Sequence, residues 1–294
     1  MFDPAQLAAL AAVLRCGSFE AAAAALSVTP PAISQRLRAL EERTGTVLVE
    51  RSQPARATAA GARLARLADE LALLQAAAAR DLGLEGDGAA PRTLRIAVTA
   101  DTLATWLLPA LARVEGHLFD LVIDDQDHAA DWLRRGEVLA AITAQPRPVQ
   151  GCDVRALGSL RYLAVASPGF HARYFAEGVT PAALEQAPAL IFDRKDRLQA
   201  DWAQALTDAS LRLPAHRIAS SEAFVSAALL GIGWGMNPES LVRPHLAAGR
   251  LVELQPGRPL DTPLYWQWAR LAAPALAPLT AAIRAAAARA MIPA

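Results

Sequence analysis

The sequence predicts a mixed α/β protein with three parts: a small, mostly helical N-terminal domain, one long helix and a larger α/β domain. Three observations support this fold class. Two short helical stretches meet at a tight turn within residues 19–43, and one helical stretch with a leucine stripe follows at residues 58–82. After Pro91, short apolar runs of strand length alternate with helical segments. This alternation is expected of a parallel sheet with crossover helices.

Composition limits the classes of protein to be considered. A length of 294 residues suggests two domains, each large enough for its own core. Alanine supplies much of the 53% hydrophobic content, and no apolar run approaches the roughly 20 residues of a membrane span. The N-terminus has an early acid and no basic segment, so we expect no secretion signal. These features predict a cytoplasmic protein without membrane association.

Three helices are expected before residue 45. The first covers residues 4–14 and ends near Gly17, and Ser18 can cap the second helix. The third helix begins at Thr29 or Pro30, because proline is tolerated in a first helical turn, where its missing N–H is no loss. Gly45 is then expected just beyond its C-terminal end.

The third helix has two distinct faces. Ile33, Leu37 and Leu40 recur at helical spacing and are expected to be buried. The opposite face carries small, polar or basic residues: Pro31, Ser34, Gln35 and Arg38. Such a helix suits the major groove of DNA, where Gln and Arg read adenine and guanine edges. An ordinary helical hairpin with a solvated polar face remains the alternative.

A short basic hairpin is predicted after this helix, at residues 47–58. Such a wing places Arg51 and Arg56 near the phosphate backbone, where contacts position a protein without specifying sequence. The net charge is zero, but eight arginines face only four acids between Arg15 and Arg66. That local excess can pair with phosphates. The complete set of candidate DNA-binding residues is Ser18, Thr29, Pro31, Ser34, Gln35, Arg36, Arg38, Arg51 and Arg56.

The long helix at residues 58–82 carries leucines at spacings of three, four and three, which form the seam of a short coiled coil. These leucines are Leu64, Leu67, Leu71 and Leu74. Because the helix lies between two domains, we favour pairing with a second subunit over burial in a core. The segment Gly83 to Pro91 has the composition of a linker.

In the α/β domain, strands are predicted at residues 94–99, 121–123, 139–143, 160–166, 189–192 and 264–269. Helices are predicted at residues 102–114, 129–135, 181–185, 222–230 and 276–289. We expect two subdomains that join near Ser159–Leu160 and again near Pro263–Leu264. Glycines from Gly231 to Gly235 are interpreted as a turn, because they lack the order of a nucleotide-binding loop.

Two motifs resemble the LysR-type transcriptional regulators: AAAAALSVTPPAISQRLRALEERTG at residues 21–45 and RATAAG at residues 56–61. The resemblance covers the whole chain. It implies a winged helix-turn-helix domain (1–57), a linker and dimerisation helix (58–90) and a periplasmic-binding-protein-like effector domain (91–294). Subdomain I is then 91–160 plus 265–294, and subdomain II is 161–264. Pro30 and Pro31 stand where the family usually has a Gln or Ser pair.

Four further stretches resemble the lysine- and arginine-responsive branch of the family, the ArgP/LysG-like regulators. They are ADTLATWLLPAL at residues 100–111, LRRGEV at 133–138, SSEAFV at 220–225 and LYW at 264–266. The resemblance implies control of a basic-amino-acid exporter gene, with L-lysine or L-arginine as the effector. It also implies a homodimer or homotetramer on an interrupted palindrome.

Catalytic and metal-binding patterns are missing from the sequence. The five histidines are scattered without ligand spacing, and no Gly-x-Ser-x-Gly motif occurs. Cys16 and Cys152 are isolated and fit neither a zinc site nor a disulfide framework. We therefore expect no enzyme, metal or cofactor.

The effector lobe has features suited to an amino acid. Residues 99–102 and 220–222 each place hydroxyl groups where a helix opens, which favours a carboxylate ligand. Open α/β sheets bind ligands at the carboxyl ends of their strands. A basic ligand also needs carboxylates, which Asp124, Asp125, Asp101 and Glu222 can supply. The candidate effector-binding residues are Thr99, Asp101, Thr102, Trp106, Asp124, Asp125, Thr143, Ser220, Ser221 and Glu222.

Several alternatives remain open at this stage. Asp101 and Glu222 can serve merely as helix caps, and Trp106 can belong to the core. The regulator can respond to a different small molecule. A solute-binding protein shares the two-lobed fold but has no reason to carry a helix-turn-helix.

Overall fold

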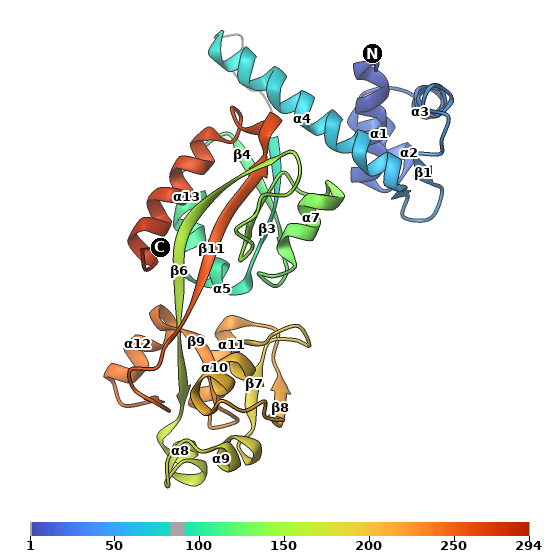
Figure 1. Ribbon diagram of the computed structural model, residues 1–294. Helices are drawn as coiled ribbons and strands as arrows, with labels where there is room; N and C mark the ends of the chain where they lie inside the picture. Colours follow the sequence, from blue (N-terminus) through green and yellow to red (C-terminus); the bar gives the residue numbers. More distant parts are fainter. Residues whose placement is uncertain (1, 83–91, 294) are drawn as a thin grey trace.

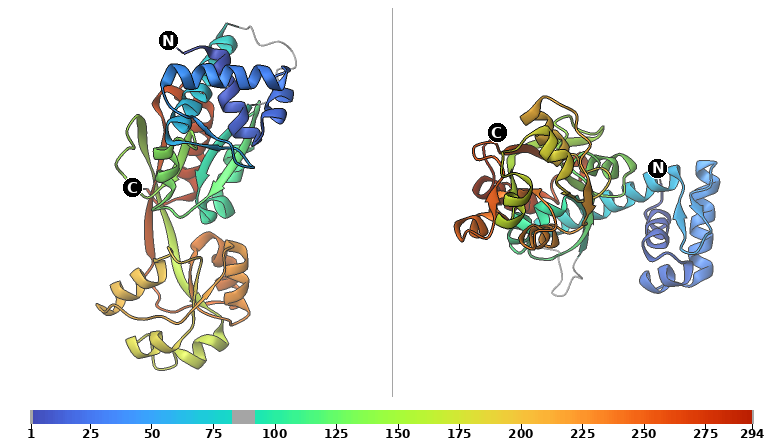
Figure 2. Two further views of the ribbon diagram at one scale, coloured as in Figure 1. Left: turned by 90° about the vertical axis from the view of Figure 1, so that its right-hand side faces the viewer. Right: turned by 90° about the horizontal axis from the view of Figure 1, so that it is seen from below.

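The structure is a computed structural model that describes residues 2–82 and 92–293. The predicted linker Gly83–Pro91 lies outside the described residues. A small helical domain sits at one end of the long helix α4, and an elongated α/β domain of two lobes lies at the other (Figures 1 and 2). In these residues no single helix is long and apolar enough to cross a membrane. Helices α1 and α2 pass that test only as a pair, bent by 120°.

The N-terminal domain is a three-helix unit with helices α1 (Pro4–Cys16), α2 (Phe19–Ala25) and α3 (Pro30–Thr44). The predicted caps are confirmed. Gly17 and Gly45 end α1 and α3 with φ of 72° and 68°, and the Ser18 hydroxyl accepts from the Ala21 N–H at 3.1 Å. The predicted buried face of α3 is confirmed as well, since Ile33, Leu37 and Leu40 are at most 1% exposed.

The wing consists of the antiparallel strands β1 (Val49–Glu50) and β2 (Arg56–Ala57), and α4 (Ala59–Asp81) follows it. Gly61 lets α4 start directly beneath the wing, because a Cβ there would lie 1.9 Å from the Leu48 carbonyl oxygen. The leucine stripe of α4 is divided. Leu64 and Leu67 pack partly against the N-terminal core, whereas Leu71 is 37% exposed.

The main sheet of the α/β domain has seven strands in the order β10-β6-β11-β5-β3-β4, with β9 also paired to β6. Strand β3 pairs in parallel with β4 and β5, whereas β11 is antiparallel to β5 and β6. The sheet is therefore mixed, and not the parallel sheet expected from the alternation of elements. Its strands are β3 (Arg92–Val98), β4 (His117–Ile123), β5 (Ala140–Thr143), β6 (Cys152–Ala166), β9 (Gly235–Pro238), β10 (Val252–Glu253) and β11 (Leu260–Ala269).

Strands β6 and β11 pass through both lobes (Figure 1). The two predicted crossing points face each other, because Ser159 pairs with Pro263 and the register shifts between Leu264 and Tyr265. Near this point Ser159 also pairs with Ile292 at the C-terminal end of the chain. The upper lobe in Figure 1 contains β3–β5, with helices α5 (Ala100–Thr102), η1 (Leu103–Leu107), α6 (Leu108–Leu111), α7 (Ala129–Arg135), η2 (Arg270–Ala272) and α13 (Ala277–Ala290).

The lower lobe surrounds a second small sheet. Strands β7 (Ala189–Ile191) and β8 (Ala215–Arg217) pair in parallel there. Its helices are α8 (Pro168–Tyr174), α9 (Pro181–Gln186), α10 (Leu198–Thr207), α11 (Ser221–Leu229) and α12 (Glu239–Ala247). The single helix predicted at residues 102–114 is wrong in detail, since a π-helical turn, η1, divides it. Such turns often occur beside functional sites.

Candidate effector pocket and DNA-binding surface

Helix α3 presents its polar side chains to solvent. Pro31, Ser34, Gln35 and Arg38 are exposed, and Arg36 is half-buried. Helix α1 packs against both α3 and α4 and thereby holds α3 on the outside of the domain (Figure 1). The face opposite Leu37 is therefore free to enter a groove. Thr29 is the N-cap residue of α3 and makes no side-chain cap, whereas the Ser18 hydroxyl is used to cap α2.

The wing adds two arginines to this surface. The Arg51 guanidinium stacks over the Phe19 ring at 5.6 Å from its centroid, and both Arg51 and Arg56 are exposed. Stacking on Phe19 orients Arg51 at the start of α2 without using its hydrogen-bond donors. The site therefore offers a recognition face on α3 and two cations on the wing, which match the groove and backbone contacts of a winged helix-turn-helix.

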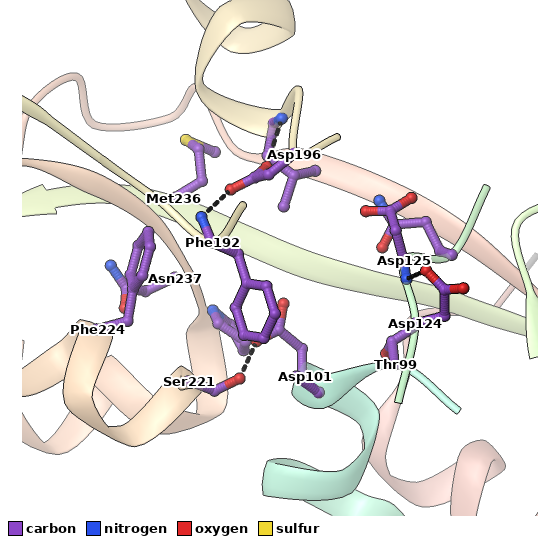
Figure 3. Close-up of a pocket in the computed structure, with 14 residues that line it drawn as sticks. Thr99, Asp101, Asp124, Asp125, Phe192, Asp196, Ser221, Phe224, Met236 and Asn237 are labelled. Carbon is purple, nitrogen blue, oxygen red and sulfur yellow. Dashed lines mark hydrogen bonds between the residues drawn. The ribbon is translucent and has the colours of Figure 1, made fainter. Parts of the chain in front are cut away.

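A second candidate site is a pocket where the two lobes meet (Figure 3). The space between its walls, with open solvent included, is about 540 Å³. The upper lobe supplies Thr99, Ala100, Asp101, Asp124, Asp125 and Gln126 to its wall. The lower lobe supplies Phe192, Asp196, Leu198, Ser221, Phe224, Met236, Asn237 and Pro238. Four of these residues are aspartates.

Asp101 connects the lobes. Its carboxylate oxygens accept hydrogen bonds from the Ser221 hydroxyl at 2.7 Å and the Tyr162 hydroxyl at 2.8 Å. Burial raises the pKa of Asp101 above its ordinary value, although both hydrogen bonds oppose this shift. Both oxygens are engaged within the protein, so Asp101 contributes charge to the pocket more than it contributes a free acceptor.

Asp124 has the opposite balance. Partial burial raises its pKa, but hydrogen bonds from the Lys195 ammonium and the Trp132 indole lower the pKa below its ordinary value overall. Both donors lie at 2.8 Å, and the Asp125 N–H also donates to the Asp124 carboxylate. Asp124 is therefore ionised and paired.

Asp125 of the upper lobe and Asp196 of the lower lobe interact electrostatically. Burial raises the pKa of both carboxyl groups, and the charge of Asp196 raises that of Asp125 further. The charge of Asp101 in turn raises the pKa of Asp196. Backbone N–H groups of Phe192 and Leu198 donate to Asp196 at 2.7 and 3.0 Å. These carboxylates repel one another, which favours a cationic ligand between them.

Asn237 adds a neutral acceptor to the same wall. Its Nδ2 donates to the Gly235 carbonyl at 3.1 Å, while its Oδ1 is buried and has no hydrogen-bond partner among the described residues. A buried acceptor without a partner costs free energy, and a donor group on a ligand relieves that cost. Asn237 therefore favours a ligand rich in N–H donors.

Family models identify both parts of the chain. The LysR substrate binding domain matches residues 87–288, and the bacterial regulatory helix-turn-helix protein of the lysR family matches residues 4–62. The chain belongs to the LysR family. It is a DNA-binding transcriptional regulator and not an enzyme, and its helix-turn-helix rules out the solute-binding protein considered from the sequence.

Relatives of this LysR-family regulator match over nearly the full length. LysG of Mycobacterium tuberculosis is 45% identical over 97% of this chain and 93% of the relative. The lysine export transcriptional regulatory protein LysG of Corynebacterium glutamicum is 40% identical over 96% of both chains. The crystal structure of ArgP from M. tuberculosis superposes with a TM-score of 0.89 at 42% identity, covering 100% of each chain.

A further structure is directly relevant to the pocket. Full-length C. glutamicum LysG with bound effector Arg superposes with a TM-score of 0.77 at 40% identity, covering 99% of this chain and 100% of that one. The resemblance to the ArgP/LysG-like branch is thus established, together with the fold of a helix-turn-helix domain joined to a LysR substrate-binding domain.

The predicted effector residues divide into two groups in this LysR-family regulator. Thr99, Asp101, Asp124, Asp125 and Ser221 line the pocket. The remaining five are not among its lining residues: Thr102, Trp106, Thr143, Ser220 and Glu222.

The positions of these five have simple physical explanations. Trp106 is 4% exposed and packs in the core of the upper lobe. Thr102 and Thr143 are fully buried; the Thr102 hydroxyl bonds that of Thr99, and the Thr143 hydroxyl donates to a backbone carbonyl. Ser220 caps α11 through the Ala223 N–H, and Glu222 is exposed.

Several pocket residues escaped the sequence reasoning, above all Asp196. It comes four residues after the end of the apolar run 189–192, on the carboxyl side of strand β7. The rule that pointed to Asp124 and Asp125 after β4 therefore applies to Asp196 as well. Asn237 was missed for another reason: a turn was predicted at Gly231 to Gly235, and β9, which begins at Gly235, was not predicted as a strand.

Proposed function

We propose that this LysR-family regulator senses a basic amino acid, L-arginine or L-lysine, in the pocket between its lobes. The observation that carries the proposal is the set of four aspartates that line the pocket. Asp124 is paired with the ammonium group of Lys195. An amino acid with a cationic side chain brings two positive groups and one carboxylate. Arginine as the effector in C. glutamicum LysG supports the same chemistry.

The pocket also has partners for the two ends of such a ligand. Thr99 and Ser221 place hydroxyl groups on opposite walls, one from each lobe, where the hydroxyl protons go to Thr102 and Asp101 and the oxygens can still accept from a ligand (Figure 3). Asp125 and Asp196 can receive ammonium or guanidinium groups through charge-assisted hydrogen bonds. A ligand that bonds both walls stabilises one arrangement of the lobes over others, and this differential affinity shifts the arrangement of the DNA-binding domains.

The proposal extends to assembly and target. The boundaries are proposed as 1–57 for the DNA-binding domain, 58–90 for the linker helix and 91–294 for the effector domain. Subdomain I comprises 91–160 and 265–294, and subdomain II comprises 161–264. A homodimer through the linker helix, assembling further into a tetramer, binds an interrupted palindrome in the cytoplasm. The lysine export function named for the C. glutamicum relative supports a basic-amino-acid exporter gene as the target.

The experiment is a calorimetric titration of the full-length protein with arginine, lysine and ornithine. Citrulline and norleucine serve as neutral counterparts of similar length. Selective binding of the cationic amino acids is the expected result. Equal binding of citrulline and arginine, or no binding by any member of the panel, overturns the basic-effector proposal and favours a different small molecule.

A variant pair connects this binding to the pocket. Asp196→Asn removes one charge from the wall and is expected to weaken arginine binding about tenfold or more, since hydrogen bonds to charged groups contribute about 1.5–3 kcal/mol. Glu222→Gln removes one charge from the exposed surface of α11 and is the matched control. Equal loss in both variants contradicts the placement of the ligand beside Asp196.

A further inference from the structure

Lys195 is the single lysine of the chain, and its ammonium bonds Asp124, one of the aspartates that line the pocket. Its Nζ donates to Asp124 Oδ1 at 2.8 Å. The two residues belong to different lobes, because Asp124 follows β4 of the upper lobe and Lys195 lies between β7 and α10 of the lower lobe. The ion pair therefore crosses the cleft where the two lobes meet.

Asp124 has no unoccupied carboxylate oxygen while this pair is formed. Oδ1 accepts from both Lys195 Nζ and the Asp125 N–H, and Oδ2 accepts from the Trp132 indole. An incoming ammonium or guanidinium group therefore meets a carboxylate that already holds a cation. Two positive charges at one carboxylate repel each other, so one of them has to leave.

The ion pair between Lys195 and Asp124 costs little free energy to break. The Lys195 side chain is 45% exposed, whereas that of Asp124 is 18% exposed. Ion pairs that solvent reaches contribute little to stability, because water screens them and the long side chain regains freedom when released. The lysine can thus swing into solvent at small cost, while Asp124 stays in the wall of the pocket.

The turn that carries Lys195 also carries a pocket residue. Asp193 Oδ1 accepts from the backbone N–H groups of Lys195 and Asp196 at 2.7 and 3.1 Å. The same turn therefore places Asp196 in the wall and Lys195 on the opposite lobe's carboxylate. A ligand that binds Asp196 therefore lies close to the ion pair between Lys195 and Asp124.

We propose that Lys195 is an internal competitor of the effector's cation: it occupies Asp124 in the effector-free protein and is displaced when a basic amino acid enters. This inference rests on the proposed function. It makes Lys195 a selectivity residue, because only a ligand with a cationic side chain brings a second positive group, besides its α-ammonium, that can replace the lysine at Asp124. A neutral amino acid leaves the pair in place.

The first test compares arginine and citrulline binding by calorimetry in the full-length parent, Lys195→Met and Arg194→Met. Arg194 is the exposed neighbour on the same turn, so its variant removes an equal charge without touching the pair. Loss of the competitor is expected to raise arginine affinity about two- to fivefold. Citrulline binding should not change in either variant. Unchanged or weaker arginine binding by Lys195→Met overturns the proposal.

The second test observes the lysine itself. Reductive methylation with ¹³C-formaldehyde gives one side-chain signal, since the chain has a single lysine, and the label keeps the positive charge. Asp124→Asn supplies the signal of the released side chain. Saturating arginine is expected to move the parent signal toward that position. If arginine binds and the signal does not move, the competitor role of Lys195 is contradicted and the proposed function stands. If no amino acid of the calorimetric panel binds, the proposed function itself is contradicted.

Discussion

At the scale of single residues, Asp125 and Asp196 are expected to make arginine affinity depend on pH. Burial and a neighbouring carboxylate raise the pKa of each group above its ordinary value. A bound cation favours the ionised form, so ligand binding lowers these pKa values and releases protons. Arginine affinity is therefore expected to be full above the raised pKa values and to fall as the pH drops through them. Calorimetry in buffers of different ionisation enthalpy measures the released protons.

The control for this prediction is again Glu222→Gln, which should release as many protons as the parent. Asp196→Asn should release fewer, because one titrating group is gone. An affinity that stays constant until the pH reaches the ordinary range of exposed carboxylates contradicts the link between these two aspartates and the ligand.

Arg38 is the residue through which DNA reading is most directly tested. It is exposed on the face of α3 opposite Leu37. Arg38→Ala should weaken operator binding by about 1–3 kcal/mol if the guanidinium reads a base. Arg43→Ala, in the last turn of the same helix, should have a smaller effect that depends mainly on salt. Titration of labelled operator DNA measures both, and an unchanged affinity removes Arg38 from the recognition set.

The sequence revealed some pocket residues and not others for a physical reason. Asp124 and Asp125 directly follow a strand that hydrophobicity makes recognisable, and such positions point to a ligand site. The Tyr162 hydroxyl donates to Asp101, although the two residues lie far apart in the chain. Lys195 meets Asp124 only because two lobes come together. Contacts of this kind depend on tertiary structure, which local patterns do not encode.

Helix α7 connects the pocket with the linker helix at the scale of elements. Trp132 in the middle of α7 donates to Asp124, and the neighbouring Leu133 carbonyl accepts from Arg66 of α4 at 3.3 Å. Arg66 also pairs with Glu70 at 2.8 Å on the same helix. One short helix thus touches the effector wall and the helix that carries the DNA-binding domain.

A substitution at Gly136 tests whether α7 couples the effector pocket to α4. It ends α7 with φ of 71°, and a Cβ there would lie 2.9 Å from Arg66 Cδ. Gly136→Ala is expected to cost roughly 1–2 kcal/mol through the left-handed backbone and, in addition, to displace Arg66. Operator binding in the variant should respond less to arginine than in the parent. Thermal unfolding and operator titrations with and without arginine measure the two effects separately.

Gly116 provides the matched control, because its φ of 74° is nearly the same but no atom lies within 4 Å of an added Cβ. Gly116→Ala should lose similar stability and keep the full response to arginine. An equal response in both alanine variants shows that α7 does not transmit the effector signal to α4.

Helices and strands were predictable from the sequence where their apolar residues recur at a regular spacing. Helices α1, α3 and α7 and strand β3 follow from regular apolar spacing. Strand β6 was expected only at residues 160–166, yet it begins at Cys152. Its first half is partly exposed and contains Arg155 and Gly158, so no apolar run marks it. Pairing with β11 forms this half of the strand, and that partner lies about a hundred residues away in the chain.

At the scale of the whole molecule, the divided leucine stripe of α4 determines which part is free for a second subunit. Leu64 and Leu67 are partly covered by the N-terminal core, but Leu71 remains 37% exposed. If α4 pairs between subunits, Leu71→Glu should shift the protein toward monomers in sedimentation velocity. Leu230→Glu changes a residue that is 78% exposed on the lower lobe and should leave the sedimentation coefficient as it is.

Strands β6 and β11 have a consequence for how the effector domain comes apart. Each strand belongs to both lobes, so melting one lobe removes hydrogen-bonded neighbours from the other. The lobes cannot behave as independent folding units, although they look separate in outline. We expect them to unfold in one cooperative transition. A destabilising substitution in either lobe then lowers the population of the entire sensor, and a bound ligand protects even the parts that it does not touch.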